Sequence, residues 1–146
     1  MSMVDRFVAY ATAFEDAYAT DDWSKIEPFF TEDATYHFIA APPLGGKFEG
    51  RTAVFTQFKN SVNGFDRRFD TRKVDVLEGP IEKDGGVWIR WRASYTRAGI
   101  PPLAMEGEER AVFVGDRIKL LEDRASDAEV QKIVTYFGQY GSKLKS

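Results

Sequence analysis

The chain has 146 residues, a length typical of one domain with its own hydrophobic core. Its formal net charge of −3 excludes a general attraction to nucleic acid or to an anionic membrane surface. It has no Cys, which excludes disulfides, thiolate catalysis and Cys-ligated zinc. No apolar run reaches the ~18 residues of a membrane-spanning helix, and the N-terminus lacks a signal-peptide pattern. We therefore expect a single domain over residues 1–146 and a cytoplasmic location.

The first third of the chain predicts two helices and a strand. Apolar residues recur at helical spacing and predict a helix over residues 3–19. Ser24 and Glu27 have the spacing of a capping box, which predicts a short helix over residues 24–30. The alternation from Ala34 to Phe38 predicts a strand that ends near Ile39. The Pro- and Gly-rich segment that follows predicts a loop.

The rest of the chain predicts a helix, four strands and a closing helix. A helix is expected over residues 51–62, ended by Asn63 and Gly64. Strands are expected over residues 69–77, 87–96, 103–114 and 117–123. Gly79 and Pro80 are expected to close the first of these strands. A second capping box at Ser126 begins the last helix, which ends at Gly141. This order indicates an α+β fold with a mainly antiparallel sheet.

Alternation also predicts which strand residues face inward. Along residues 87–96, Trp91 and Tyr95 share one face, whereas Trp88, Arg90 and Arg92 share the other. The segment 67–73 mixes basic residues with Asp, a pattern that predicts a solvated strand edge; a site for phosphate or carboxylate is the alternative.

Three motifs carry a resemblance to a known group of proteins. They are DDWSKIEPFFTEDATYHF at residues 21–38, FEGRTA at 48–53, and the hairpin over 115–123. Together they resemble the nuclear transport factor 2-like superfamily, and within it the SnoaL-like family of polyketide cyclases and ketosteroid isomerase-like proteins. The resemblance implies a strongly bent sheet that wraps as a cone around three helices of the N-terminal half, with a C-terminal helix. It further implies a mostly apolar pocket for a small apolar molecule. It also implies a homodimer that forms through the outer face of the sheet. Trp88 on that face is either an interface residue or a partly covered surface residue.

Two of the family's activities are excluded because this chain lacks residues that they require. Ketosteroid isomerases use a Tyr where this chain has Phe14, and an Asp base where it has Phe38; their second acid falls near Glu109. Scytalone dehydratases use paired His, and His37 is the one His here. Alternation points His37 away from the pocket if Phe38 points in, but a bulge would make His37 the best general base.

Asp123 resembles the late-strand Asp that serves as base in limonene epoxide hydrolases and SnoaL-type cyclases. On the concave wall it would be desolvated, which would raise its pKa and its strength as a base. In a competing interpretation, Asp123 forms a salt bridge near Arg124 or caps the helix at Ser126. The partner motif of the epoxide hydrolases is replaced by Arg90-Trp91-Arg92, whose Arg side chains are expected to point outward.

Two functions therefore stay open. The first is a lyase, isomerase or epoxide-hydrolase-like enzyme without cofactor or metal, in which Asp123, His37 and Glu109 are catalytic. The second is a non-catalytic module that binds a small molecule or dimerises. Tyr10, Tyr18, Tyr36 and Tyr95 are candidates for orienting a ligand. The residues expected to line the pocket are Phe14, Tyr18, Phe38, Phe55, Phe58, Trp91, Tyr95 and Phe113.

Overall fold

The computed structural model describes residues 1–146, and its elements confirm an α+β fold. The helices are α1 (Met3–Thr20), η1 (Trp23–Phe29), α2 (Arg51–Gly64), η2 (Asp66–Arg68), α3 (Asp127–Tyr140) and η3 (Gly141–Lys143). The strands are β1 (Phe30–Ile39), β2 (Gly46–Glu49), β3 (Thr71–Lys83), β4 (Gly86–Thr96), β5 (Leu103–Val114) and β6 (Arg117–Arg124).

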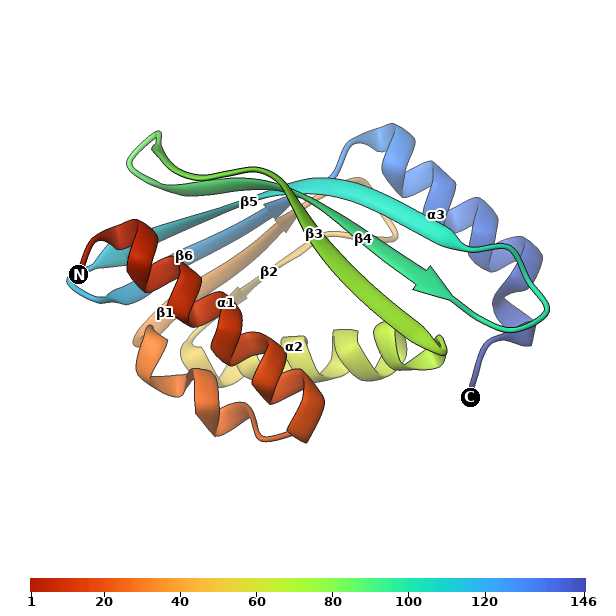
Figure 1. Cartoon of the computed structure of the whole chain (residues 1–146), viewed down its shortest axis with the longest axis horizontal. Helices are drawn as coiled ribbons and strands as arrows, with labels where there is room; N and C mark the ends of the chain where they lie inside the picture. The colour runs from red at the N-terminus through yellow and green to blue at the C-terminus, as the bar shows by residue number, and fades with distance from the viewer.

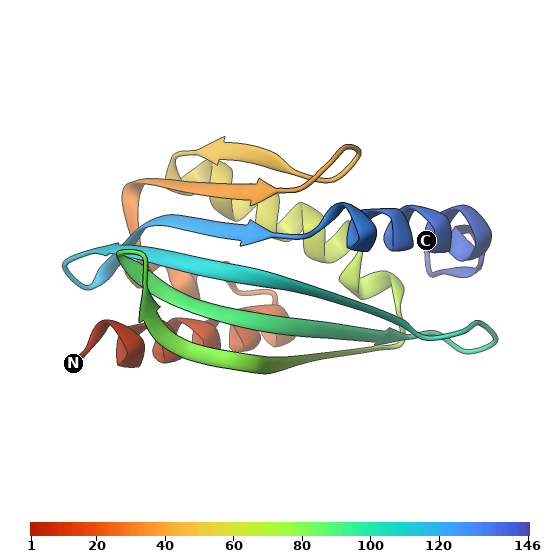
Figure 2. The same ribbon diagram turned by 90° about the horizontal axis from the view of Figure 1, so that it is seen from above.

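The six strands form one curved sheet in the order β2-β1-β6-β5-β4-β3. Strands β1 and β6 pair in parallel and all other neighbours pair antiparallel. The sheet is therefore mainly antiparallel, as the sequence predicted, although the one parallel pair was not predicted. Helices α1, η1 and α2 lie together against one side of the sheet, whereas α3 continues from β6 beyond the sheet's end (Figures 1 and 2). The sheet therefore bends around the helices of the N-terminal half and leaves its other face uncovered.

Aromatic side chains fill the space between helices and sheet. Phe30, at the start of β1, is fully buried and meets Tyr10 of α1 and Phe55 of α2 edge-on, with ring centroids 5.3 and 5.4 Å apart. Burying a side chain of this size contributes about 2–3 kcal/mol, and edge-to-face contacts add to it. A second cluster, around Phe69 and Tyr136, joins the far end of the sheet to α3.

Both predicted capping boxes need correction. The first short helix is capped by Asp22, whose Oδ1 accepts from the Ser24 N–H at 3.2 Å. The left-handed conformation of Asp21 (φ 60°) ends α1 and lets this helix begin earlier than the Ser24 motif predicted. At α3, Ser126 caps the helix as predicted. Glu129, which would complete the capping box, instead accepts a hydrogen bond from the Glu106 N–H of β5 at 3.2 Å.

Two strand predictions also need correction. The segment expected to be a loop contains edge strand β2, which pairs with β1 and stacks Phe48 on Tyr36. Strand β3 does not end at Gly79 and Pro80 but runs on to Lys83, because a register shift between Glu78 and Ile81 spans the two residues and accommodates the missing Pro N–H. Gly79 is required there, since a Cβ would lie 2.5 Å from the Trp88 carbonyl oxygen and φ is +85°.

Candidate functional site

A cavity of about 550 Å³ lies between the concave face of the sheet and helices α1 and α2. Of its 29 lining residues, 20 are hydrophobic, a composition and size typical of small-molecule sites. On β4 the predicted alternation is correct, because Ile89, Trp91, Ala93 and Tyr95 all face this cavity. The predicted residues that line it are Phe14, Phe38, Phe58, Trp91 and Tyr95.

Three predicted pocket residues do not line the cavity. Tyr18 lies one helical turn, about 6 Å, beyond Phe14 and carries the Arg72 guanidinium 4.5 Å above its ring. Phe55 is turned toward Phe30 in the core. Phe113 lies beyond a bulge near the end of β5 and packs against the same core.

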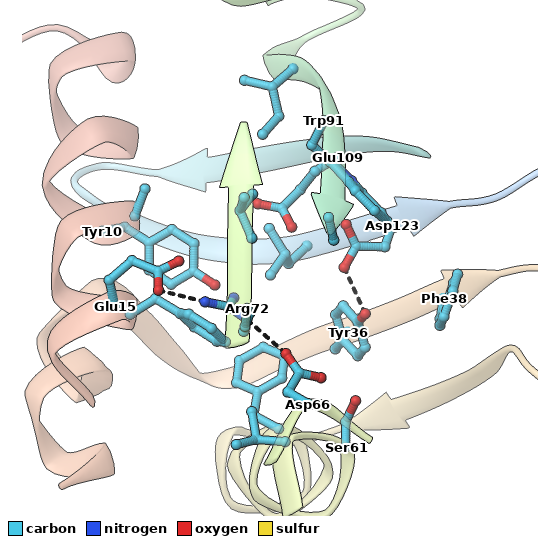
Figure 3. Close-up of a pocket in the computed structure, with 18 of the residues that line it drawn as sticks. Tyr10, Glu15, Tyr36, Phe38, Ser61, Asp66, Arg72, Trp91, Glu109 and Asp123 are labelled. Carbon is cyan, nitrogen blue, oxygen red and sulfur yellow. Dashed lines mark hydrogen bonds and ion pairs between the residues drawn. The ribbon is translucent and has the colours of Figure 1, made fainter. Parts of the chain in front are cut away.

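Two acids from neighbouring strands, Glu109 and Asp123, form a polar part of the cavity wall. Glu109 on β5 and Asp123 on β6 are directly paired in the sheet register, so their side chains emerge side by side on the concave face (Figure 3). The Tyr36 hydroxyl donates a hydrogen bond to Asp123 Oδ2 at 2.6 Å. The other oxygen, Oδ1, is buried and accepts no hydrogen bond from a permanent donor. Oδ1 is thus a buried acceptor that has no hydrogen-bond partner of its own.

The surroundings raise the pKa of both acids, but unequally. Burial raises the pKa of Glu109 well above its usual range, and the neighbouring charge of Asp123 adds to the effect. Burial also raises the pKa of Asp123, but the hydrogen bond that its carboxylate accepts from Tyr36 opposes that rise. One proton shared by the pair therefore resides mainly on Glu109, and Asp123 is the stronger candidate for the ionised member.

Tyr10 of α1 faces the acid pair from the helix side. Its ring is buried, its hydroxyl points into the cavity (Figure 3), and the residue lines the cavity wall. Burial raises its pKa, and the charges of Glu109 and Asp123 raise that pKa further. The hydroxyl stays protonated near neutral pH and can therefore donate a hydrogen bond to a molecule in the cavity.

His37 does not line the cavity. Strand β1 pairs with β6 without a register shift from Thr35 to Ile39, so strict alternation places His37 on the face opposite to Phe38. The bulge that would bring it into the cavity lies nearer Phe30. The prediction of His37 as a base inside the cavity is therefore wrong.

The competing interpretation of Asp123 is also wrong. The Asp123 carboxylate pairs with the hydroxyl of Tyr36 rather than with Arg124, and Ser126 itself caps α3. Arg90 points outward as predicted, where it pairs with Glu78 and Glu106 at 2.9 Å each. Tyr36 was predicted only as a candidate for orienting a ligand, and its contact with Asp123 was not predicted. Its position two residues before Phe38 places both on one face of the strand.

A second polar cluster lines the cavity around Arg72 of β3. The Arg72 guanidinium pairs with Asp66 of η2 through Nε and with Glu15 of α1 through Nη1, each at 2.7 Å. The Arg72 side chain is only 11% exposed, so the predicted solvated edge at residues 67–73 is wrong at this residue, whereas Asp70, Thr71 and Lys73 are exposed. Periodicity on the strand could not reveal this, because both acids come from other elements.

No group of three or more His, Asp or Glu side chains is arranged to hold a metal ion. None of the helices combines the length and apolar character needed to cross a bilayer.

Solved structures resemble this fold across most of the chain. Bal32a, from a soil-derived mobile gene cassette, is 20% identical with a TM-score of 0.63, over 84% of this chain and 90% of its own. A protein with a ketosteroid isomerase-like fold from Catenulispora acidiphila, in complex with trimethylamine, is 18% identical with a TM-score of 0.60, over 83% and 88%. A candidate polyketide cyclase from Xanthomonas campestris is 16% identical with a TM-score of 0.60, over 92% and 98%.

Identities this low show the fold alone, and that fold is the nuclear transport factor 2-like cone that the sequence motifs implied. No match was found among curated proteins. The sequence profile of the SnoaL-like domain matches residues 11–125, a span that contains the second half of α1, all of α2 and both acids of the Glu109–Asp123 pair. The chain therefore belongs to the SnoaL-like domain family.

Proposed function

We propose that the protein catalyses proton transfer, without a cofactor, on a small hydrophobic, polyketide-like carbonyl compound held in the cavity. The observation that carries the proposal is the Glu109–Asp123 pair, set in an apolar wall with a Tyr36 hydrogen bond on one side of Asp123 only. Two adjacent carboxyls with unequal pKa values supply a base and an acid at the same pH.

In this proposal Asp123 is the base. Its carboxylate removes a proton from the carbon next to the substrate carbonyl, and the electron pair of that C–H bond moves into an enolate. Protonated Glu109 and the Tyr10 hydroxyl then donate hydrogen bonds to the enolate oxygen, which stabilises the negative charge in a site that water does not screen. In a cyclase, the enolate carbon attacks a second carbonyl of the same molecule, and the resulting alkoxide takes up the proton from protonated Asp123. In an isomerase, Asp123 instead returns the proton to another carbon of the delocalised enolate.

A purely binding role is the second candidate, and the apolar lining favours it. Phe14 and Phe38 occupy the positions where ketosteroid isomerases place two of their polar catalytic groups, so the known donor–base pair of that subfamily is missing. In a binder, Trp91 would contribute most to affinity and Asp123 little.

Hydrogen–deuterium exchange into a simple carbonyl compound separates the two roles. The protein is incubated with 2-tetralone in D₂O, and deuterium uptake next to the carbonyl is followed by mass spectrometry. We expect acceleration by the wild type and a loss of about 10²–10⁴-fold in Asp123→Asn. His37→Gln, which alters a residue outside the cavity, should exchange like the wild type. Equal rates in wild type and Asp123→Asn would contradict Asp123 as base, and retained thermal stabilisation by 2-tetralone in that variant would then favour the binder.

A further inference from the structure

The cavity carries a second polar region whose arrangement differs from that of the acid pair. Arg72 is surrounded by the Glu15 and Asp66 carboxylates, the Tyr18 ring and the Tyr95 hydroxyl. Arg72 stays positively charged. Burial disfavours the charged guanidinium, but the two carboxylates outweigh burial and raise the pKa of Arg72. Three elements, α1, η2 and β3, thus converge on one guanidinium at the cavity wall (Figure 3).

This cluster retains hydrogen-bonding capacity toward the cavity. Asp66 Oδ2 accepts from Arg72 and from the Tyr95 hydroxyl, the latter at a long 3.5 Å, while Oδ1 is directed away from Arg72 in Figure 3. Arg72 has five N–H donors, of which two are used by these carboxylates. Arg72, Asp66 and Tyr95 all line the cavity, so their unused donors and acceptors can reach a molecule inside it.

The charge balance of the cluster restricts what it can bind. Glu15 and Asp66 already place two acids around the single positive charge of Arg72. A carboxylate added by a ligand would meet a site with no surplus positive charge, and its desolvation would go uncompensated. A neutral hydroxyl or ketone can use the free donors and acceptors without that cost.

We propose that Arg72, Asp66 and Tyr95 form a second polar subsite, which binds a neutral hydroxyl or ketone at the end of the ligand remote from the Glu109–Asp123 pair. In Figure 3 Asp66 and Glu109 lie on different sides of the drawn cavity, and apolar side chains lie between them. The inference rests on the proposed function in one respect, namely that the cavity holds a small apolar molecule. It adds that this molecule is neutral and polar at two separate points.

Paired phenols test the subsite by quenching of Trp fluorescence. Three diphenols of increasing length, 4,4′-dihydroxybiphenyl, 4,4′-dihydroxydiphenylmethane and 4,4′-dihydroxystilbene, are each compared with the monophenol of the same skeleton. We expect at least one diphenol to bind about tenfold more tightly than its monophenol in the wild type. That advantage should vanish in Tyr95→Phe and in Asp66→Asn while monophenol binding is kept. Arg97→Met, which breaks an ion pair with Asp70 that does not line the cavity, should keep the advantage.

The outcomes separate the subsite from the proposed function. Equal affinity of every diphenol and its monophenol would overturn the subsite alone, and so would an advantage that survives in both variants. Tighter binding of 4′-hydroxybiphenyl-4-carboxylate than of the diphenol would also overturn it, since Arg72 would then be an anion site. Failure of every phenol to bind would overturn the subsite together with the binding cavity on which the proposed function depends.

Discussion

The Tyr36 hydroxyl donates a hydrogen bond to one carboxylate oxygen of Asp123 at 2.6 Å, whereas the other carboxylate oxygen has no hydrogen-bond partner. The hydrogen bond favours the ionised form of Asp123, whereas burial and the charge of Asp123 favour the protonated form of Glu109. One tyrosine thus makes two neighbouring carboxyls unequal, which is the condition for an acid and a base to coexist.

Removal of that hydroxyl is expected to make the pair less unequal. In Tyr36→Phe the pKa of Asp123 should rise above its wild-type value, because the bond that stabilises the carboxylate is lost. The free energy of unfolding should fall by about 1–2 kcal/mol. Carbon-13 NMR titration of the side-chain carboxyls and urea denaturation measure the two effects.

Tyr136→Phe is the matched control for that variant. Its hydroxyl donates to the Pro101 carbonyl at 2.7 Å, in the other aromatic cluster. This variant should also lose stability but leave the titration of Asp123 unchanged. If Tyr36→Phe leaves the Asp123 titration where it was, the assigned role of Tyr36 is wrong.

The buried Glu109 should make stability depend on pH in a defined direction. Its pKa in the folded chain lies above the unfolded value of about 4.3, so between those values the folded chain binds more protons than the unfolded chain. The free energy of unfolding therefore falls as pH rises through this window. Glu109→Gln should lose less stability than the wild type from about pH 5 to about pH 8. Glu32→Gln, at an exposed residue of β1, should follow the wild type, and urea denaturation at both pH values decides the matter.

Gly107 is expected to be essential for the position of the Trp91 indole. The two residues are directly paired between β5 and β4, and a Cβ on Gly107 would lie 2.5 Å from Trp91 Cζ2 and 2.6 Å from the Arg124 carbonyl oxygen. Gly107→Ala should lower the free energy of unfolding by about 1–3 kcal/mol and shift the Trp emission spectrum. Gly138→Ala, in α3 with no atom near its Cβ, should instead raise stability by about 0.5–1 kcal/mol. A loss of stability in both variants would exclude this explanation.

The outer face of the sheet stays the predicted homodimer interface. Trp88 is half-buried there. Its indole N–H donates a hydrogen bond to the Glu108 carboxylate at 2.9 Å, and the Lys83 ammonium lies 4.2 Å from the centre of its ring. We propose that a second copy covers this face, and light scattering at micromolar concentration should then give twice the chain mass. Trp88→Glu should shift the protein toward monomer, and a wild-type monomer would contradict the proposal.

Local patterns predicted the fold well because they record which face of each element is buried. The alternation along β4 placed Trp91 and Tyr95 correctly, and the helical spacing located α1 and α2 to within a few residues. Edge strand β2 was missed because its four residues lie in a Gly-rich segment and are mostly exposed. The cap at Asp22 was missed because the choice among neighbouring polar residues depends on the backbone at Asp21.

The site was harder to predict because its contacts join distant parts of the chain. Asp123 and Glu109 could each be named from the resemblance, but their pairing depends on the β5–β6 register. The contact between Tyr36 and Asp123 depends on the parallel pairing of β1 with β6, and the Arg72 cluster on three separate elements. No periodicity in a single segment records such contacts.

The central claim is that Glu109 and Asp123 form one titrating unit in the cavity. The most direct measurement is the carbon-13 titration of the Glu109 carboxyl in the wild type and in Asp123→Asn. The account predicts that Glu109 titrates well above the usual glutamate range in the wild type, and that its pKa falls but stays raised in Asp123→Asn, because burial remains when the neighbouring charge is removed. A Glu109 that titrates in the usual range, or that is unaffected by Asp123→Asn, would contradict it.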